Sequence, residues 1–256
     1  MSDLLHIGKT IFENRERLAD ILPIKESFDL IQRDILIGNR QSSFYFIDGM
    51  IKDEVMLKLM DSIMKVQEAD MPPDATAFSQ KNIPYVEVDI LGDYDQVLRN
   101  VLSGVLVLFI DGYSAGIAID CRTYPARSVD EPDKDKSLRG SKDGFVETVV
   151  FDTALIRRRI RDPHLVMEML EVGSSSRSDV VLCYMKNLVN PDLLDNVRSK
   201  IEAVRTTDLC MNQQSLAEAL IGTRWYNPFP KFKFSERPDT AAACIMEGKV
   251  AILVDN

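Results

Sequence analysis

The feature that most constrains how this chain can fold is a pattern that occurs twice. A helix candidate, a glycine, an apolar strand and an aspartate follow one another in DQVLRNVLSGVLVLFIDG and again in DTAAACIMEGKVAILVDN, which ends the sequence. This alignment, 144 positions apart, matches Asp95 with Asp239, Gly104 with Gly248 and Asp111 with Asp255. Chance identity is the alternative, because helix–glycine–strand–aspartate is common in α/β proteins. We interpret the pattern as an internal duplication of one α/β unit.

The earlier elements repeat in the same order. Apolar residues at helical spacing predict helices, and apolar or alternating runs predict strands. The helix 10–22 corresponds to 151–161, the strand 30–37 to 165–172, the strand 43–47 to 180–185, and the helix 53–66 to 192–204. The second copy ends where the first still has the strand 116–122. We therefore expect a shortened second copy and a polypeptide that continues after Asn256.

Regular periodicity fades between the copies, where Pro125, Pro132, Gly140 and Gly144 interrupt any element. We predict an N-terminal α/β subdomain over 1–122, a connecting segment over 123–150 and a C-terminal α/β subdomain over 151–256. Each subdomain is expected to be a small mixed β-sheet flanked by helices. The segment 71–82, which contains a double proline, is expected to be a loop.

Composition excludes some functions. The 256 residues carry a net charge of −9, with a pI near 4.9. A general nucleic-acid binder needs a basic face, so we expect no nucleic-acid partner. Neither a signal peptide nor a run of about 18 apolar residues occurs, so the sequence as given is predicted to be soluble and cytosolic.

Catalytic patterns are missing from the sequence. His6 and His164 are the only histidines and lie in different copies, and the four cysteines have no metal-ligand spacing. Neither usual glycine-rich phosphate loop occurs. We therefore predict that the chain is not an enzyme and has no metal site and no cofactor.

Arginines mark the candidate binding residues. Arg157, Arg158, Arg159 and Arg161 form the densest charge run, and on a helix they would point in several directions. They are predicted either to pair with acidic residues of the connecting segment or to bind an anionic partner, a neighbouring subunit or lipid headgroups. Arg139 and Gly140 could likewise hold an anion or form a salt bridge between the subdomains.

Four stretches, RTYPARSVDEPD, LRGSKDGFVETVVFDTALIRRRIRDP, WYNPFPKFKFSERPDTAA and EGKVAILVD, resemble the A-subunit family of spore germinant receptors of the GerA type. The resemblance covers about residues 27–255. Its signature residues are Arg139, Gly140, Asp143, Gly144, Phe145, Glu147, Glu236, Arg237, Pro238 and Asp239. The family gives them no established catalytic role, and we take Glu236, Arg237 and Asp239 as further binding or interface candidates.

The resemblance implies the N-terminal domain of a longer spore inner-membrane protein, on the cytosolic (core) side, with membrane helices after residue 256. It also implies self-association and contact with other spore membrane proteins. The expected role is assembly and coupling of a germinant-receptor-associated ion-release complex. The alternative is a two-lobed domain that senses a small germinant or metabolite in its cleft.

Overall fold

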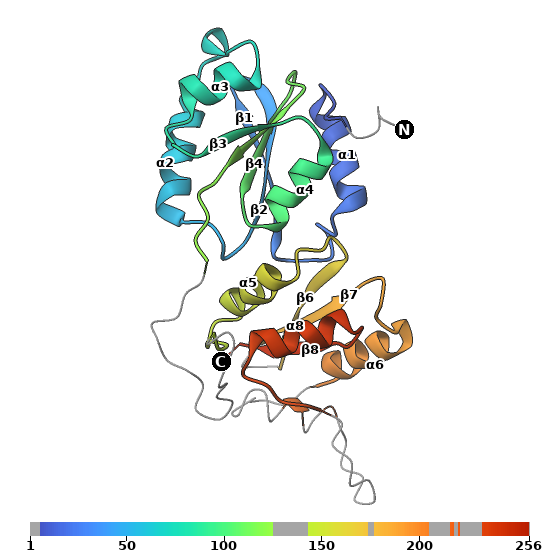
Figure 1. The fold of residues 1–256 in the computed structure, drawn as a ribbon. Helices are drawn as coiled ribbons and strands as arrows, with labels where there is room; N and C mark the ends of the chain where they lie inside the picture. The colour runs from blue at the N-terminus through green and yellow to red at the C-terminus, as the bar shows by residue number, and fades with distance from the viewer. Residues whose placement is uncertain are drawn as a thin grey trace, which may run out of the picture. The chain divides into compact units, whose positions relative to one another are not determined.

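The computed structural model describes residues 6–124, 143–173, 177–204, 216–217, 220 and 232–255 (Figure 1). The chain folds as two compact units. Unit 1 comprises Met1–Pro125 with Arg161–Pro163, and unit 2 comprises Ala126–Ile160 with His164–Asn256. The predicted α/β class with two sheet-containing subdomains is confirmed, while the predicted domain boundaries stay predictions.

Unit 1 is built on a five-stranded sheet of order β1-β2-β4-β5-β3. Its strands are β1 (Leu30–Ile37), β2 (Arg40–Ile47), β3 (Val88–Leu91), β4 (Leu106–Ile110) and β5 (Gly116–Ile119). All four strand pairs are antiparallel. The expectation of a mixed sheet was therefore wrong in strand direction, because short hairpin turns join β1 to β2 and β4 to β5.

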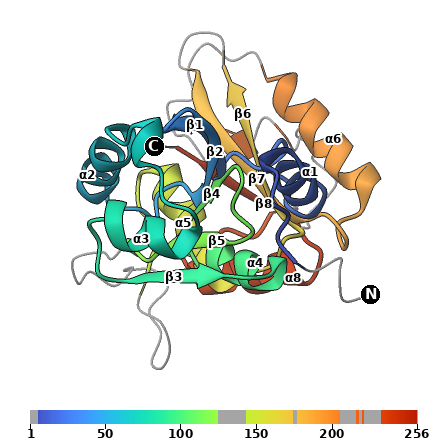
Figure 2. The same cartoon turned by 90° about the horizontal axis from the view of Figure 1, so that it is seen from above.

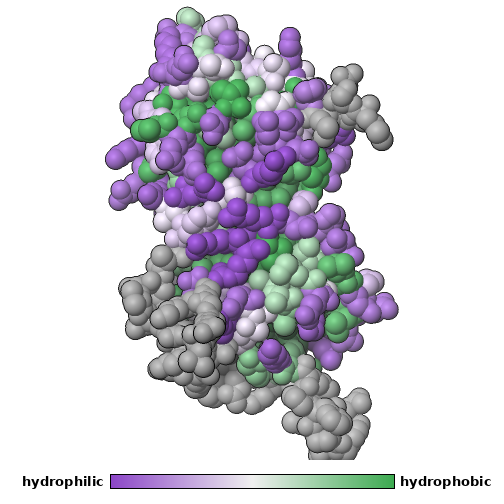
Figure 3. Space-filling model, viewed as in Figure 1, coloured by the Kyte–Doolittle hydropathy of each residue, from purple (hydrophilic) through white to green (hydrophobic). Residues whose placement is uncertain are grey.

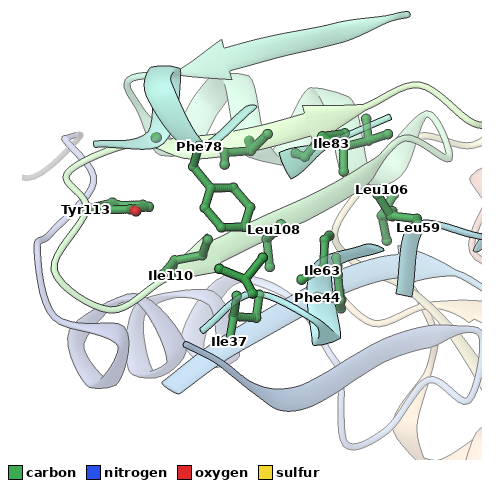
Figure 4. Packing of buried hydrophobic residues seen from close by; sticks show 14 of the residues in the cluster. Ile37, Phe44, Leu59, Ile63, Phe78, Ile83, Leu106, Leu108, Ile110 and Tyr113 are labelled. Carbon is green, nitrogen blue, oxygen red and sulfur yellow. The ribbon is translucent and has the colours of Figure 1, made fainter. Parts of the chain in front are cut away.

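Helices cover both faces of this sheet (Figures 1 and 2). The helices α1 (Ile11–Ile21) and α4 (Tyr94–Leu102) lie on one face, and α2 (Asp53–Met64) and α3 (Ala75–Asn82) lie on the other. On the second face Phe44, Leu108 and Ile110 pack beneath Ile63 and Phe78, all nearly inaccessible to solvent (Figure 4). Burial of such apolar side chains supplies most of the stabilising free energy of a fold.

The double proline led us to predict a loop over 71–82, but most of this segment forms the helix α3. After a short 3₁₀ turn, Glu68–Asp70, Asp74 accepts a hydrogen bond from the backbone N of Ala77 at 2.8 Å and begins α3. Phe78, on the inner side of that helix, is completely buried. An N-cap and one buried aromatic side chain thus hold a helix of only eight residues.

Unit 2 has a three-stranded antiparallel sheet of order β6-β7-β8. Its strands are β6 (Leu165–Val172), β7 (Ser178–Met185) and β8 (Ala251–Val254), and its helices are α5 (Val149–Arg159), α6 (Pro191–Glu202) and α8 (Pro238–Met246). Leu194 and Ile201 of α6 pack on one face of the sheet. The helices α5 and α8 contact each other and the strands of that sheet.

The strand register of unit 2 repeats that of unit 1. Ser42 pairs with Ile110 and Phe44 with Leu108 in unit 1. In unit 2 the counterparts of Ser42 and Phe44, 138 positions later, are Val180 and Leu182. They pair with Val254 and Ile252, which are the counterparts of Ile110 and Leu108, 144 positions later. A shared register with shared helix lengths supports the predicted duplication at the level of individual residue pairs.

The matching helices α4 and α8 differ in the side that they expose. Gln96 and Arg99 of α4 are exposed, whereas the corresponding positions of α8 carry Thr240 and the exposed Ala243. Met246, at the end of α8, is 51% exposed. Figure 3 shows the resulting apolar area, in pale green, over α8. The outward side of α4 in unit 1 is therefore polar, whereas that of its counterpart α8 in unit 2 is largely apolar.

Candidate functional site

Three separate parts of unit 2 bring most of the described signature residues together. We call this group the signature cluster, and its members are Asp143, Phe145, Arg159, Glu236, Arg237 and Asp239. Asp143 and Phe145 precede α5, and Arg159 is the last residue of that helix. The remaining three lie immediately before α8 or in its first turn. The fold thus joins two motifs that are about 90 residues apart in the sequence.

A backbone hydrogen bond and an ion pair link the parts of the cluster. The N–H of Phe145 donates to the carbonyl oxygen of Glu236 at 2.9 Å, which joins the segment before α5 to the segment before α8. Arg159 Nη2 donates to Asp143 Oδ2 at 2.8 Å, and its Nη1 donates to the Leu155 carbonyl, also at 2.8 Å. The arginine thereby fastens the segment before α5 to the last turn of that helix.

Arg237 and Asp239 form a second, bidentate pair. Arg237 Nε donates to Asp239 Oδ1 at 3.0 Å and Nη2 donates to Oδ2 at 2.6 Å, a geometry that suits guanidinium and carboxylate groups. Arg237 is buried. The hydrogen bond from Arg237 lowers the pKa of Asp239, with smaller contributions from the Thr240 N–H and from the charge of Arg159. The cluster therefore contains positive and negative groups that stabilise one another.

Two further carboxylates meet the start of α5. Asp152 Oδ1 accepts from the N–H of Val146 at 2.8 Å, and Asp255 Oδ1 accepts from the N–H of Val149 at 2.9 Å. The pKa of Asp152 is raised to about 7, mainly by burial; the hydrogen bond from the Val146 N–H opposes the rise, and the negative charges of Glu147 and Asp255 add to it. A carboxyl group at this position can thus change its protonation state near neutral pH.

The arginine run does not form one surface. Arg157 is completely buried and its Nη2 donates to the Leu165 carbonyl at 3.1 Å. Arg159 belongs to the signature cluster, while Arg158 and Arg161 are exposed. Arg139 and Gly140 lie outside the described residues, as do the acidic residues proposed to pair with the run. The fold therefore brings Arg159, Arg237 and Asp239 together, and the exposed arginines are not members of that group.

The contacts of the signature cluster are structural, because they hold the segment before α5 to the end of that helix and to the segment before α8. The two arginines each bind a carboxylate. Asp255 accepts from the N–H of Val149 at the start of α5, and Asp239 accepts from the N–H of Thr240 in the first turn of α8, where the helix dipole favours a negative charge. Among the residues that the structure describes, no group of three or more His, Cys, Asp or Glu could hold a metal ion. Sequence reasoning did not select Asp152; the signal that could have found it is its match with Asn14, 138 positions earlier.

Comparison with known proteins matches nearly the whole chain to one protein family. The model of the Bacillus/Clostridium GerA spore germination protein family matches residues 18–256. Stage V sporulation protein AF of Bacillus subtilis is 33% identical over 95% of this chain and 49% of that protein. The uncharacterized membrane protein YfkQ of the same organism is 30% identical over 98% of this chain and 48% of that protein. The chain thus spans about half the length of these relatives.

A solved structure supports the fold. The N-terminal domain of the A subunit of the Bacillus megaterium spore germinant receptor GerK3 superimposes with a TM-score of 0.72 and 23% sequence identity. The match covers 98% of this chain and 92% of that one. In the described part of the present chain, no helix is both long and apolar enough to cross a bilayer.

Proposed function

The chain belongs to the GerA family of spore germination proteins, and from this premise we propose that it acts in the assembly and coupling of a germinant-receptor-associated ion-release complex. In this proposal it is the N-terminal domain of a spore inner-membrane protein and lies on the core side of that membrane. Its partners are other copies of the full-length protein and other spore membrane proteins.

The observation that carries the proposal is the internal pairing of the family signature. Arg237 and Asp239 bind each other, and the Phe145 N–H binds the Glu236 carbonyl. Residues that converge on a substrate usually leave donors or acceptors directed at it. Here the signature holds the starts of α5 and α8 in place, as expected of a module that must present a defined shape to partners.

The residues proposed to meet partners are Arg158, which is exposed near the end of α5 in unit 2, and Arg161, which is exposed and belongs to unit 1. Exposed guanidinium groups form bidentate hydrogen bonds with carboxylates and phosphates, and arginine is common at interfaces. A charge there can change without disturbing the core. Arg157, by contrast, cannot serve, because it is buried inside unit 2.

The test replaces Arg158 and Arg161 together with glutamate in the full-length protein of a sporulating host. If both arginines contact a partner, co-purified partner should fall roughly thirtyfold, which corresponds to about 2 kcal/mol at an interface hot spot. The melting temperature should change by less than about 2 °C, since the substitutions are on the surface.

Arg99→Glu is the control, because Arg99 is an exposed arginine near the C-terminal end of another helix, α4 of unit 1. It should leave both partner recovery and germination unchanged. Normal partner recovery and germination in the double variant would contradict the proposal. A stabilising thermal shift with an amino acid or nucleotide would instead favour the small-molecule sensing alternative, which stays a prediction.

A further inference from the structure

The two sheets differ at one edge. In unit 1, β4 pairs on one side with β2 and on the other with β5, where Leu106 lies opposite Ile119 and Leu108 opposite Ile117. In unit 2, β8 pairs with β7. Within the described ranges, no strand pairs with the other side of β8. The strand of unit 2 that corresponds to β4 therefore has one edge without a described partner.

The hydrogen-bonding pattern shows which groups lie along this edge. The N–H of Asp255 donates to the Asp179 carbonyl at 2.9 Å, as the N–H of Asp111 donates to Gln41 in unit 1. Donors alternate in direction along an antiparallel strand. The N–H groups of Leu253 and Ala251 therefore point toward β7, and those of Ile252 and Val254 point outward.

Side-chain burial marks the same edge. Leu106, Leu108 and Ile110 of unit 1 are at most 2% exposed, because Ile117 and Ile119 of β5 pack beside them. Their counterparts in unit 2, Val250, Ile252 and Val254, are only partly buried although they pack on the same core as α6. Apolar side chains that are fully covered in one copy thus lack part of their cover in the other.

The edge also lacks the usual protection against pairing. Natural edge strands carry charges, prolines or bulges that prevent another strand from adding to them. The sequence of β8 is Ala-Ile-Leu-Val, which has neither charge nor proline. Such an edge is suited to accept a strand, and strand addition is a common mode of recognition.

We propose that the outer edge of β8 docks one further antiparallel strand of the same polypeptide, in the register that β5 keeps on β4. The added strand places apolar side chains opposite Val250 and Ile252, where Ile119 and Ile117 stand in unit 1. The repeat indicates which part of the polypeptide supplies this strand. In unit 1, β5 follows β4 after the turn at Asp111, and Asp255 is the counterpart of Asp111, so the strand is expected to follow Asp255 in the polypeptide. The curated relatives are about twice as long as the matched chain, which leaves length for such a strand. The inference concerns the framework of unit 2 and does not depend on the proposed role in assembly.

The test is residue-resolved amide hydrogen exchange on the full-length protein in detergent. If the strand is docked in this register, the outward amide of Ile252, the counterpart of Leu108, exchanges at least about 100-fold more slowly than unprotected amides. The inward amides of Ala251 and Leu253 are the internal control for the β7 ladder, and the amide of Leu108 shows the protection of a strand paired on both sides. Fast exchange at Ile252 beside slow exchange at Leu253 overturns the proposal.

Dilution distinguishes the source of the strand. Protection from the same polypeptide is independent of protein concentration, whereas protection by a second copy or a separate partner falls on dilution and also overturns the proposal. A matched pair of variants gives a second readout. With the strand docked, Ile252→Ala and Leu108→Ala lower the melting temperature by similar amounts, of about 5 °C or more. A loss for Ile252→Ala below about a third of that for Leu108→Ala contradicts the proposal.

Discussion

The two units carry different side chains at one equivalent position in their first helix, α1 or α5. In unit 1 the buried Asn14 accepts from the N–H of Gly8 and donates to the Gly8 carbonyl, both at 3.0 Å. In unit 2 Asp152 accepts from the N–H of Val146 at 2.8 Å. Both residues fasten the preceding loop to the helix. A neutral amide can do so at any pH, whereas a buried carboxyl group does so at a cost that depends on protonation.

A second pair of equivalent positions differs still more. Ala19 of α1 is exposed, whereas Arg157, 138 positions later in α5, is completely buried. One helix therefore faces solvent where the other faces the interior of its unit. These two comparisons indicate that the two copies share a backbone arrangement, while at these two positions unit 2 buries ionisable side chains.

The largest expected effect is the loss of Arg157. Arg157→Ala should destabilise unit 2 by about 3 kcal/mol or more, because a buried charge is removed from the groups that it binds. Chemical denaturation followed by hydrogen exchange in β6 and β7 measures this loss. Ala19→Arg is the matched control and should change stability by less than about 0.5 kcal/mol. Similar effects for the two variants would refute the contrast.

The next effect depends on pH. Asp152 has a folded-state pKa of about 7, above the usual carboxyl value, so the folded state binds more protons than the unfolded state between about pH 4 and pH 7. Stability from this group is therefore full at low pH and is lost as the pH rises through 7. Asp152→Asn, which restores the amide found in unit 1, should stabilise the protein by roughly 2–4 kcal/mol at pH 8 and by little at pH 4.

Denaturation curves at both pH values check this expectation. The reciprocal variant, Asn14→Asp, should introduce the same pH dependence into unit 1, because its side chain would be equally buried. A gain from Asp152→Asn that is equal at pH 4 and pH 8 would show that protonation is not the cause.

The smallest effect concerns the glycine after the matched helices α4 and α8. Gly104 and Gly248 both have positive φ, 92° and 84°. A Cβ atom at Gly248 would lie 2.8 Å from the Leu188 carbonyl oxygen, whereas one at Gly104 would meet the flexible side chain of Met50 at 2.7 Å. Both alanine variants should therefore lose about 1 kcal/mol from the backbone, and Gly248→Ala should lose about 1 kcal/mol more. Equal losses in thermal denaturation would contradict the difference.

Much of the fold could be predicted from patterns of short range. The helices α2, α4 and α6 and most strands lie where apolar periodicity placed them. The helix α5 begins at Val149, two residues before the predicted start, because the carboxylate of Asp255, which follows β8 about 100 residues later, accepts a hydrogen bond from the Val149 N–H. The helix α3 was missed because one buried aromatic residue, Phe78, outweighs a weak local pattern.

The candidate site was predictable only in part. The signature motifs were visible in the sequence, including Glu236, Arg237 and Asp239. The contact between Glu236 and Phe145 was not, because these residues come from segments that meet only in the folded unit 2. The arginine run shows the limit most clearly, since Arg157 is buried, Arg158 is exposed and Arg159 forms an ion pair with Asp143.

The sequence by itself determined that this chain is an α/β protein of the GerA family with a repeated pattern, because helix and strand periods and family motifs are local properties of the chain. Only the tertiary structure decided that the strand pairs of the described residues are antiparallel, that Arg157 is interior and that Asp152 is buried with a raised pKa. Strand direction, burial and pKa depend on which distant groups surround a residue, and those neighbours exist only once the chain has folded.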